Sequence, residues 1–228
     1  MNQSKVLLFI LLTGAEFSST AQSHELNLEL VGGASKLLTN YLPEDGTFKN
    51  CFAISESFHT NYYYNLDSSS AFGIGILFSD IRGKEITNRS ELTSSGNTKT
   101  SENTIHKSYW FCGIDLRYRL SIHKFQLEIG GFYSVMLRKR ATATGHSLDG
   151  SNAVDWEYDV EQTTSYQDAG FTVATTYPLT DRLSIGIQYT QGLINIASVH
   201  TEFPNYSYPW KNYTTQIGLK FTFKILKF

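Results

Sequence analysis

From residue 24 onward, apolar side chains recur at every second position, and polar or small residues fill the positions between them. A period of two places alternate residues on opposite faces of an extended strand, so this pattern predicts strands with one apolar and one polar face. The pattern is clearest near the C-terminus, where Ile217, Leu219 and Phe221 alternate with Gly218 and Lys220. Eight segments follow it: 26–30, 52–66, 71–79, 110–120, 125–138, 168–177, 183–190 and 213–225.

The links between these segments alternate in length. The short links are 67–70, 121–124 and 180–181. The long, polar links are 37–50, 84–104, 139–162 and 197–211. Short turns at one rim and long loops at the other are typical of membrane barrels with an even strand number. We therefore expect an all-β fold, an eight-stranded antiparallel up-and-down transmembrane β-barrel.

The first 23 residues have the composition of a secretory signal peptide. Lys5 precedes an unbroken apolar run from Val6 to Leu12, and small residues follow it. Cleavage after Ala21 or after Ser23 fits the preference for small residues at such a site. We expect residues 1–23 to be the signal peptide and residues 24–228 to form the barrel. No later apolar run approaches the roughly 20 residues that a membrane helix needs.

Composition narrows the remaining choices. Hydrophobic residues make up 41% of the chain and charged residues 18%, which argues against disorder. The formal net charge of −2 gives no reason to expect a nucleic-acid partner. The chain has two cysteines, Cys51 and Cys112, which is fewer than a disulfide-stabilised domain usually carries. We therefore expect both to be free thiols. The sequence has no metal-ligand spacing and no nucleotide-binding loop, so no metal and no cofactor is expected.

Aromatic residues gather next to the predicted short turns. Six of them share the parity of the apolar face: Tyr62, Tyr64, Phe72, Tyr118, Phe125 and Tyr177. In a bilayer, such rings lie at the headgroup layer, so we expect an interfacial aromatic girdle. The alternative is that these rings are ordinary apolar contacts in a soluble core.

Charged residues occupy the opposite, inward parity. They are Glu29, Asp115, Arg117, Arg119, Glu128, Asp168, Lys220 and Lys224. Side chains fill the lumen of an eight-stranded barrel, and buried charges need partners. We therefore expect an internal salt-bridge network that fills the lumen, in preference to an ion or proton pathway. Pairing of Leu120 with Phe125 across the turn at 121–124 would place Arg117 opposite Glu128.

With strands, turns and girdle placed in this way, residues 24–228 resemble the small bacterial outer-membrane barrels of the OmpA and OmpX size class. They also resemble the PorT-like outer-membrane β-barrel domain family of the Bacteroidetes. The resemblance implies an integral outer-membrane location, with outer-membrane lipid, lipopolysaccharide and the barrel assembly machinery as partners. Such barrels end in an aromatic assembly signal, which Phe228 matches. Because Leu226 and Phe228 have the opposite parity from Ile225, a bulge or frayed end is expected there.

The favoured function is non-enzymatic: an envelope scaffold or a surface-binding or adhesion protein that uses four long extracellular loops. A role in secretion is compatible with the same features, and the extracellular ligand is not identified. Aromatic loop residues are candidate ligand contacts, or pack the loops together: Trp156, Tyr158, Tyr206, Tyr208 and Trp210. A narrow pore or carrier for small apolar solutes is an alternative.

A hydrolase is the remaining alternative. In an extended chain Ser198, His200 and Glu202 share one face, which supplies a nucleophile, a base and an orienting acid. Outer-membrane lipid A deacylases are barrels with a His two residues before a Ser, whereas the order here is reversed. Same-face neighbours also lie about 6.5 Å apart along a strand, beyond hydrogen-bonding distance. A polar base to the loop is the favoured interpretation.

Overall fold

The computed structural model describes residues 23–39, 48–92, 98–147, 156–159, 165–196, 200–203, 206–209 and 212–227. Within these ranges the chain forms strands joined by turns and short irregular segments. The strands are β1 (His24–Thr39), β2 (Phe48–Asn65), β3 (Ser70–Leu92), β4 (Thr98–Ile122), β5 (Phe125–Ser147), β6 (Trp156–Asp159), β7 (Gln167–Pro178), β8 (Leu183–Gly192), β9 (His200–Phe203), β10 (Tyr206–Pro209) and β11 (Asn212–Lys227).

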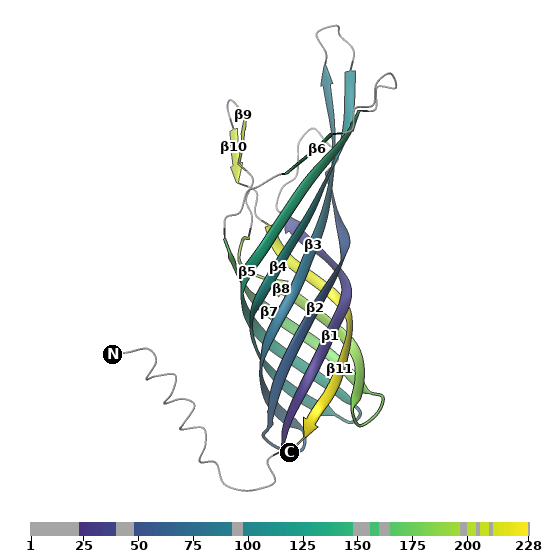
Figure 1. The fold of residues 1–228 in the computed structure, drawn as a ribbon, viewed down its shortest axis with the longest axis vertical. Coiled ribbons are helices and arrows are strands. Elements are labelled where there is room, and N and C mark those ends of the chain that lie inside the picture. The colour runs from purple at the N-terminus through teal and green to yellow at the C-terminus, as the bar shows by residue number, and fades with distance from the viewer. Residues whose placement is uncertain are drawn as a thin grey trace, which may run out of the picture.

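Eight of these strands close into a ring. Their order is β4-β3-β2-β1-β11-β8-β7-β5, and β5 pairs back with β4. All the pairs are antiparallel, and the ring order follows the order along the chain. The seam between β1 and β11 joins the two ends of the barrel sequence (Figure 1). The predicted eight-stranded antiparallel up-and-down barrel is confirmed.

The period-two pattern decides which side chains enter the ring. On β3, Phe72, Ile74 and Ile76 are exposed on the outer surface, while Gly73 and Gly75 between them are buried. The inward series of β2 consists of buried polar residues: Ser55, Ser57, His59 and Asn61. A soluble barrel buries its apolar residues and exposes its polar ones. Over most of its height, this barrel exposes apolar side chains and buries polar ones.

The turn between β4 and β5 corrects one predicted register. Ile122 pairs with Phe125 across a two-residue turn, so the predicted pairing of Leu120 with Phe125 is wrong. Arg119, not Arg117, lies opposite Glu128. Ile122 continues the outward apolar series into the turn, and His123 takes the positive φ of 57° that a two-residue hairpin requires.

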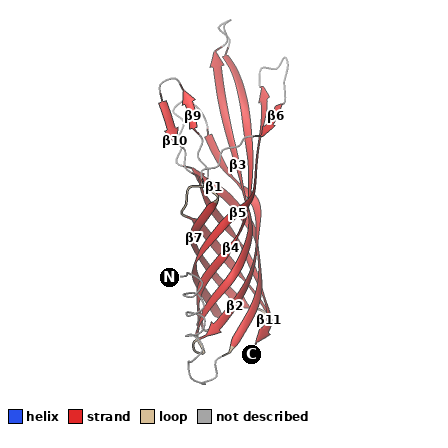
Figure 2. Ribbon diagram, turned by 60° about the vertical axis from the view of Figure 1, so that its left-hand side comes forward, coloured by secondary structure: helices blue, strands red, loops and turns tan. Residues whose placement is uncertain are grey.

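Two of the predicted long loops consist largely of strand. β3 and β4 remain paired up to Leu92 and Thr98, across most of 84–104. β5 continues to Ser147, into the predicted loop 139–162, and there pairs with β6. Figure 2 shows these strands rising far above the ring. Beyond the ring there is neither lipid nor an enclosed lumen to sort the side chains. Backbone pairing therefore persists there without the period-two pattern that signals a strand in the sequence.

The expected irregularity near the C-terminus is a bulge. Leu26 pairs with Leu226 but Asn27 pairs with Lys224, so Ile225 is the extra residue on β11. Ile225 and Leu226 are each 45% exposed. The bulge therefore lets two consecutive side chains face outward, although they have opposite parity. Phe228 lies outside the described residues, and so do residues 1–22 of the predicted signal peptide.

Candidate functional site

A buried cluster of charges fills the half of the lumen nearest the short turns. Arg117 of β4 lies at its centre, with Nη1 2.6 Å from Oε2 of Glu29 and 3.1 Å from Oε2 of Glu128. Its Nη2 is 2.5 Å from Oδ2 of Asp115. Lys220 of β11 completes the cluster, with Nζ 3.0 Å from Oε2 of Glu29 and in contact with Glu128. These charges come from β1, β4, β5 and β11, so the cluster links four walls of the ring.

A second cluster adjoins the first on the side of the turns. Arg119 Nη2 lies 2.7 Å from Oε2 of Glu25, and Lys224 Nζ lies 3.3 Å from Oε1 of the same carboxylate. Tyr63 connects the clusters: the Arg119 guanidinium lies 4.1 Å from the centre of its ring, and its hydroxyl donates to Glu29 Oε1 at 3.5 Å. The four carboxylates and four cations of the two clusters sum to no net charge, which makes their burial tolerable.

The lumen residues selected by parity fall into two groups. Glu29, Asp115, Arg117, Arg119, Glu128, Lys220 and Lys224 lie in these two clusters. Asp168 does not join them: it accepts a hydrogen bond from Thr214 at 2.5 Å and has no ion pair with a described residue. Asp168 pairs with Ser134, six residues farther from the short turn than Glu128 on β5, so it lies higher in the lumen than the clusters.

Sequence reasoning missed two members. Glu25 has the same inward parity as Asn27 and Glu29, so the pattern contained the signal. Tyr63 stands between the outward Tyr62 and Tyr64 in a run of three tyrosines, and only the strict alternation assigns it to the lumen.

His59 has the expected inward parity and adjoins the central cluster, a contact that the pattern did not predict. Its Nδ1 lies 2.8 Å from Arg117 Nη2. The same nitrogen lies 3.2 Å from Asp115 Oδ2. His59 therefore lies between a cation and a carboxylate of the central cluster.

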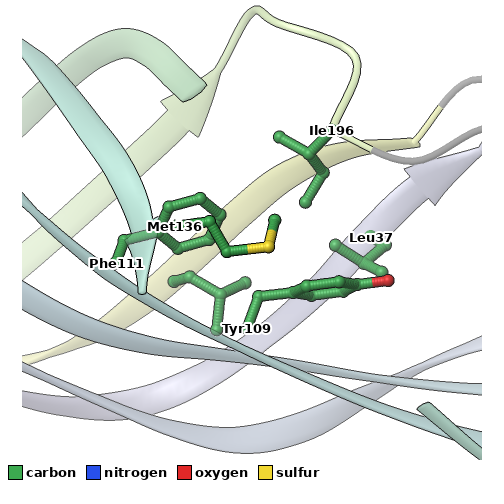
Figure 3. Packing of buried hydrophobic residues seen from close by; sticks show 6 residues of the cluster. Leu37, Tyr109, Phe111, Met136 and Ile196 are labelled. Carbon is green, nitrogen blue, oxygen red and sulfur yellow. The ribbon is translucent and has the colours of Figure 1, made fainter. Parts of the chain in front are cut away.

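An apolar cluster closes the opposite half of the lumen. Figure 3 shows Leu37, Tyr109, Phe111, Met136 and Ile196 turned toward one another inside the ring. Ile196 follows β8 and is fully buried, with its amide bonded to the Asn212 carbonyl at 3.0 Å. Between this cluster and the charges lies a cavity of about 20 Å³, lined by His59 and Asp168 among others. That volume suits about one water molecule.

The outer wall of the barrel is apolar around the ring. Exposed side chains include Ile76, Ile114, Ile129, Ile187 and Leu219, which lie on five different strands and are each 52% or 53% exposed. Because exposed apolar patches of this extent are rare on soluble proteins, this wall is suited to a hydrocarbon environment. No helix among the described residues is both long and apolar enough to cross a membrane.

The six predicted girdle residues lie on this outer wall near the short turns. Tyr62, Phe72, Tyr118, Phe125 and Tyr177 are exposed, and Tyr64 is half-buried. Some are joined in pairs: the Phe125 and Tyr177 rings have centroids 5.4 Å apart. His24 stacks on Tyr62 with centroids 5.6 Å apart, and its Nδ1 lies 2.5 Å from the Tyr62 hydroxyl. The rings thus form an aromatic band beside the short turns.

The hydrolase candidates lie only in part within the described residues. Ser198 lies outside the described residues, while the backbones of His200 and Glu202 belong to β9, where Glu202 pairs with Ser207. Within the described part of the chain, no group of three or more His, Cys, Asp or Glu side chains is arranged to hold a metal ion. Cys51 and Cys112 are free thiols.

No protein-family model matches the chain, and no curated protein matches it in sequence. Its fold is similar to that of Neisserial surface protein A, with 8% identity and a TM-score of 0.41, over 92% of this chain and 100% of that one. It is also similar to the outer membrane protease OmpT from Escherichia coli, with 9% identity and a TM-score of 0.42, over 92% and 99%. The attachment invasion locus protein Ail of Yersinia pestis is similar at 10% identity and a TM-score of 0.35, over 90% and 100%. These similarities concern the fold alone.

The location of the chain follows from its own surface. It has an apolar outer wall, an aromatic band beside the short turns, a polar filled lumen and a ring that leaves no strand edge open. Lipid tolerates only helices and closed barrels, and even-stranded antiparallel barrels of this form are those of outer membranes. The chain is an integral β-barrel protein of the bacterial outer membrane.

Proposed function

We propose that this chain is a non-enzymatic surface-binding protein of the outer membrane, which contacts an extracellular macromolecule through the strands that rise above the ring. The observation that carries the proposal is the difference in strand length. β3, β4 and β5 have 23, 25 and 23 residues, whereas β7 and β8 have 12 and 10. Compared with β7, β3 has 11 additional residues (23 − 12), or about 35 Å of extended chain.

These additional residues form a paired sheet. The register of β3 and β4 continues from Thr87–Asn103 to Leu92–Thr98, and β4 pairs with β5 as far as Ser101–Ser147. Such a sheet presents a preformed surface that loses little conformational entropy on binding. Spanning the membrane does not require it, because β7 and β8 span with far fewer residues. A role outside the membrane accounts for its length.

The filled lumen argues against the pore alternative. Arg117 and Lys220 are 2% and 0% exposed, and the apolar cluster of Phe111 and Met136 lies above them. We therefore expect planar-bilayer recordings of the refolded protein to show no steady conductance. Stable channel openings at neutral pH would favour the pore or carrier.

A hairpin exchange tests the binding proposal. Because Thr87 pairs with Asn103, residues 88–102 can be replaced by Asn-Gly, which joins the two strands in a two-residue turn. In the control variant, the same dipeptide replaces His123–Lys124 at the opposite rim. Cells that produce each protein are tested for adherence to immobilised collagen, mucin and dextran. We expect the unchanged protein and the control to adhere to at least one surface and the shortened protein to lose adherence, while all three keep heat-modifiable gel migration. Equal adherence of all three would support an envelope scaffold instead.

Several finer expectations belong to the same proposal. Residues 1–23 serve as a signal peptide, Phe228 serves as the assembly signal, and lipopolysaccharide and the barrel assembly machinery are partners. Under the same proposal, the chain is related to the OmpA- and OmpX-like barrels or to the PorT-like family. The absence of enzymatic activity has a direct test: a Ser198→Ala change should leave the acyl chains of lipid A unaltered relative to the unchanged protein. A change in lipid A acylation would favour the hydrolase.

A further inference from the structure

The mouth of the barrel at the short-turn rim contains a cavity of about 290 Å³. It is lined by three cationic side chains that come from separate parts of the ring: Arg119 of β4, Arg182 of the turn between β7 and β8, and Lys224 of β11. Asp181 is its acidic lining residue. Glu25, which is not a lining residue, pairs with Arg119 and Lys224. The lining itself thus presents cationic donors, and the cavity volume accommodates a small anion together with several waters.

The three cations keep donors available for a ligand. Arg119 uses Nη2 toward Glu25 and Asn65, and Lys224 makes one contact of 3.3 Å with Glu25. A guanidinium has five N–H donors and an ammonium has three, so both retain others. Arg182 is exposed and forms no ion pair with a described residue. Its carbonyl accepts from the Lys224 amide at 2.8 Å, which fixes the backbone of the turn against β11.

Two buried polar atoms in the cavity wall lack partners. Asn27 is 1% exposed and Thr222 is 8% exposed, yet Asn27 Oδ1 and Thr222 Oγ1 have no hydrogen bond within the described structure. Buried polar groups nearly always have a partner, so their side of the cavity is suited to a polar ligand. The hydroxyl can donate to an anion, whereas the amide oxygen needs a donor. Hydrogen phosphate has one P–OH group, and a phosphoethanolamine headgroup has an ammonium group.

We propose that this mouth binds a phosphate group, either as free inorganic phosphate or as the headgroup of a phospholipid in the periplasmic leaflet. Arg182, Lys224 and the free donors of Arg119 bind its oxygens, Thr222 donates to it, and Asn27 accepts from the donor that the ligand carries. The site lies at the rim opposite the protruding strands, and its assignment is independent of the surface-binding proposal.

The test uses the full-length protein refolded in octyl glucoside, a detergent without phosphate. Calorimetric titration with inorganic phosphate forms one arm, and titration with phosphatidylethanolamine in mixed micelles forms the other. Loss of one charge-assisted hydrogen bond corresponds to about a tenfold loss of affinity. We expect this loss in Arg182→Ala and in Lys224→Ala. Lys124→Ala removes an exposed lysine from the short turn between β4 and β5 and is the matched control.

Saturable binding in either arm that is weakened by Arg182→Ala and Lys224→Ala but not by Lys124→Ala supports the site, and the responding arm identifies the source of the phosphate. Absence of saturable binding in both arms overturns the proposal. An equal loss in the Lys124→Ala variant also overturns it, since that result indicates general attraction to a positive rim. Heat-modifiable migration of every variant verifies that the ring is folded.

Discussion

Arg117 and Glu29 are 88 residues apart in the sequence and lie on strands that are separated by β2 and β3, yet Nη1 and Oε2 are 2.6 Å apart across the lumen. The contact spans the interior of the ring instead of following its wall. Arg117 also neutralises Asp115 and Glu128, so one guanidinium serves three buried carboxylates.

Arg117→Met should be severely destabilising, because it removes the guanidinium that contacts Asp115 and leaves Glu29 and Glu128 with Lys220. Removing one partner from a buried ion pair typically costs about 3–5 kcal/mol. Urea unfolding followed by tryptophan fluorescence measures this loss. Arg138→Met, at an exposed position of β5, is the control and should change the stability by less than about 0.5 kcal/mol. Equal unfolding midpoints for the two variants would show that the buried charge network does not contribute to stability.

The lipid-facing wall predicts that the cost of introducing a charge depends on its depth in the membrane. Ile129 lies four residues above Phe125, which is in the aromatic band, and both side chains face outward. Arginine near the bilayer midplane of a barrel costs about 2–4 kcal/mol, whereas arginine near the interface costs about 0–1 kcal/mol. Ile129→Arg should therefore reduce stability in lipid vesicles much more than Phe125→Arg does. Similar losses for both variants would mean that this wall does not face hydrocarbon.

Gly113 is expected to be required because of a close approach between strands. A Cβ at this position would overlap the Tyr133 carbonyl oxygen and lie 2.6 Å from the Cα of Ser134, and neither backbone atom can rotate away. Gly113→Ala should cost about 1–3 kcal/mol through overpacking. A Cβ at Gly32 would meet no atom within 4 Å, so Gly32→Ala should be neutral or slightly stabilising. Denaturant midpoints of both variants test this difference, and a stable Gly113→Ala protein would contradict it.

Asp67 predicts a pH effect at the short turn between β2 and β3. The hydroxyls of Ser70 and Ser69 donate to its carboxylate, at 2.6 and 2.8 Å, and lower its pKa from 3.8 to about 2. A lowered folded-state pKa means that this contribution to stability is complete above pH 3.8 and is lost as the pH falls toward 2. Between about pH 5 and about pH 2.5, the urea midpoint of the unchanged protein should fall further than that of Asp67→Asn. Equal decreases in the two proteins would exclude a role of this carboxylate.

The extent to which the sequence predicted this fold depended on where the side chains lie. Within the membrane, each strand has lipid on one side and lumen on the other, so parity placed Ile217 outside and Lys220 inside. Above the ring that constraint ends, and the pairing of β3 with β4 continued unpredicted as far as Leu92. Parity assigns a side chain to a face but gives no height along the axis, which is why Asp168 was grouped with charges that it does not contact.

The strand register was the second feature that the sequence pattern did not predict correctly. Counting Ser121 and Ile122 as turn residues displaced the β4–β5 pairing by two positions, although Arg117 still reaches Glu128 at 3.1 Å because its side chain is long. The predicted contact between Arg117 and Glu128 was thus correct, although the predicted strand register was not. Glu25 and Tyr63 were missed for a different reason: one lies at the start of its strand, and the other is an aromatic residue among aromatic neighbours.

The seam between β1 and β11 makes the charge balance of the lumen depend on the last strand of the ring. Before β11 is seated, Lys220 and Lys224 are absent from the lumen, and the four carboxylates of the clusters face Arg117 and Arg119 alone. An unfinished barrel would therefore enclose an excess of two negative charges, along with two open edges. Insertion of the final strand removes both defects at once, so a correctly completed molecule is distinguished from a truncated one by charge as well as by shape.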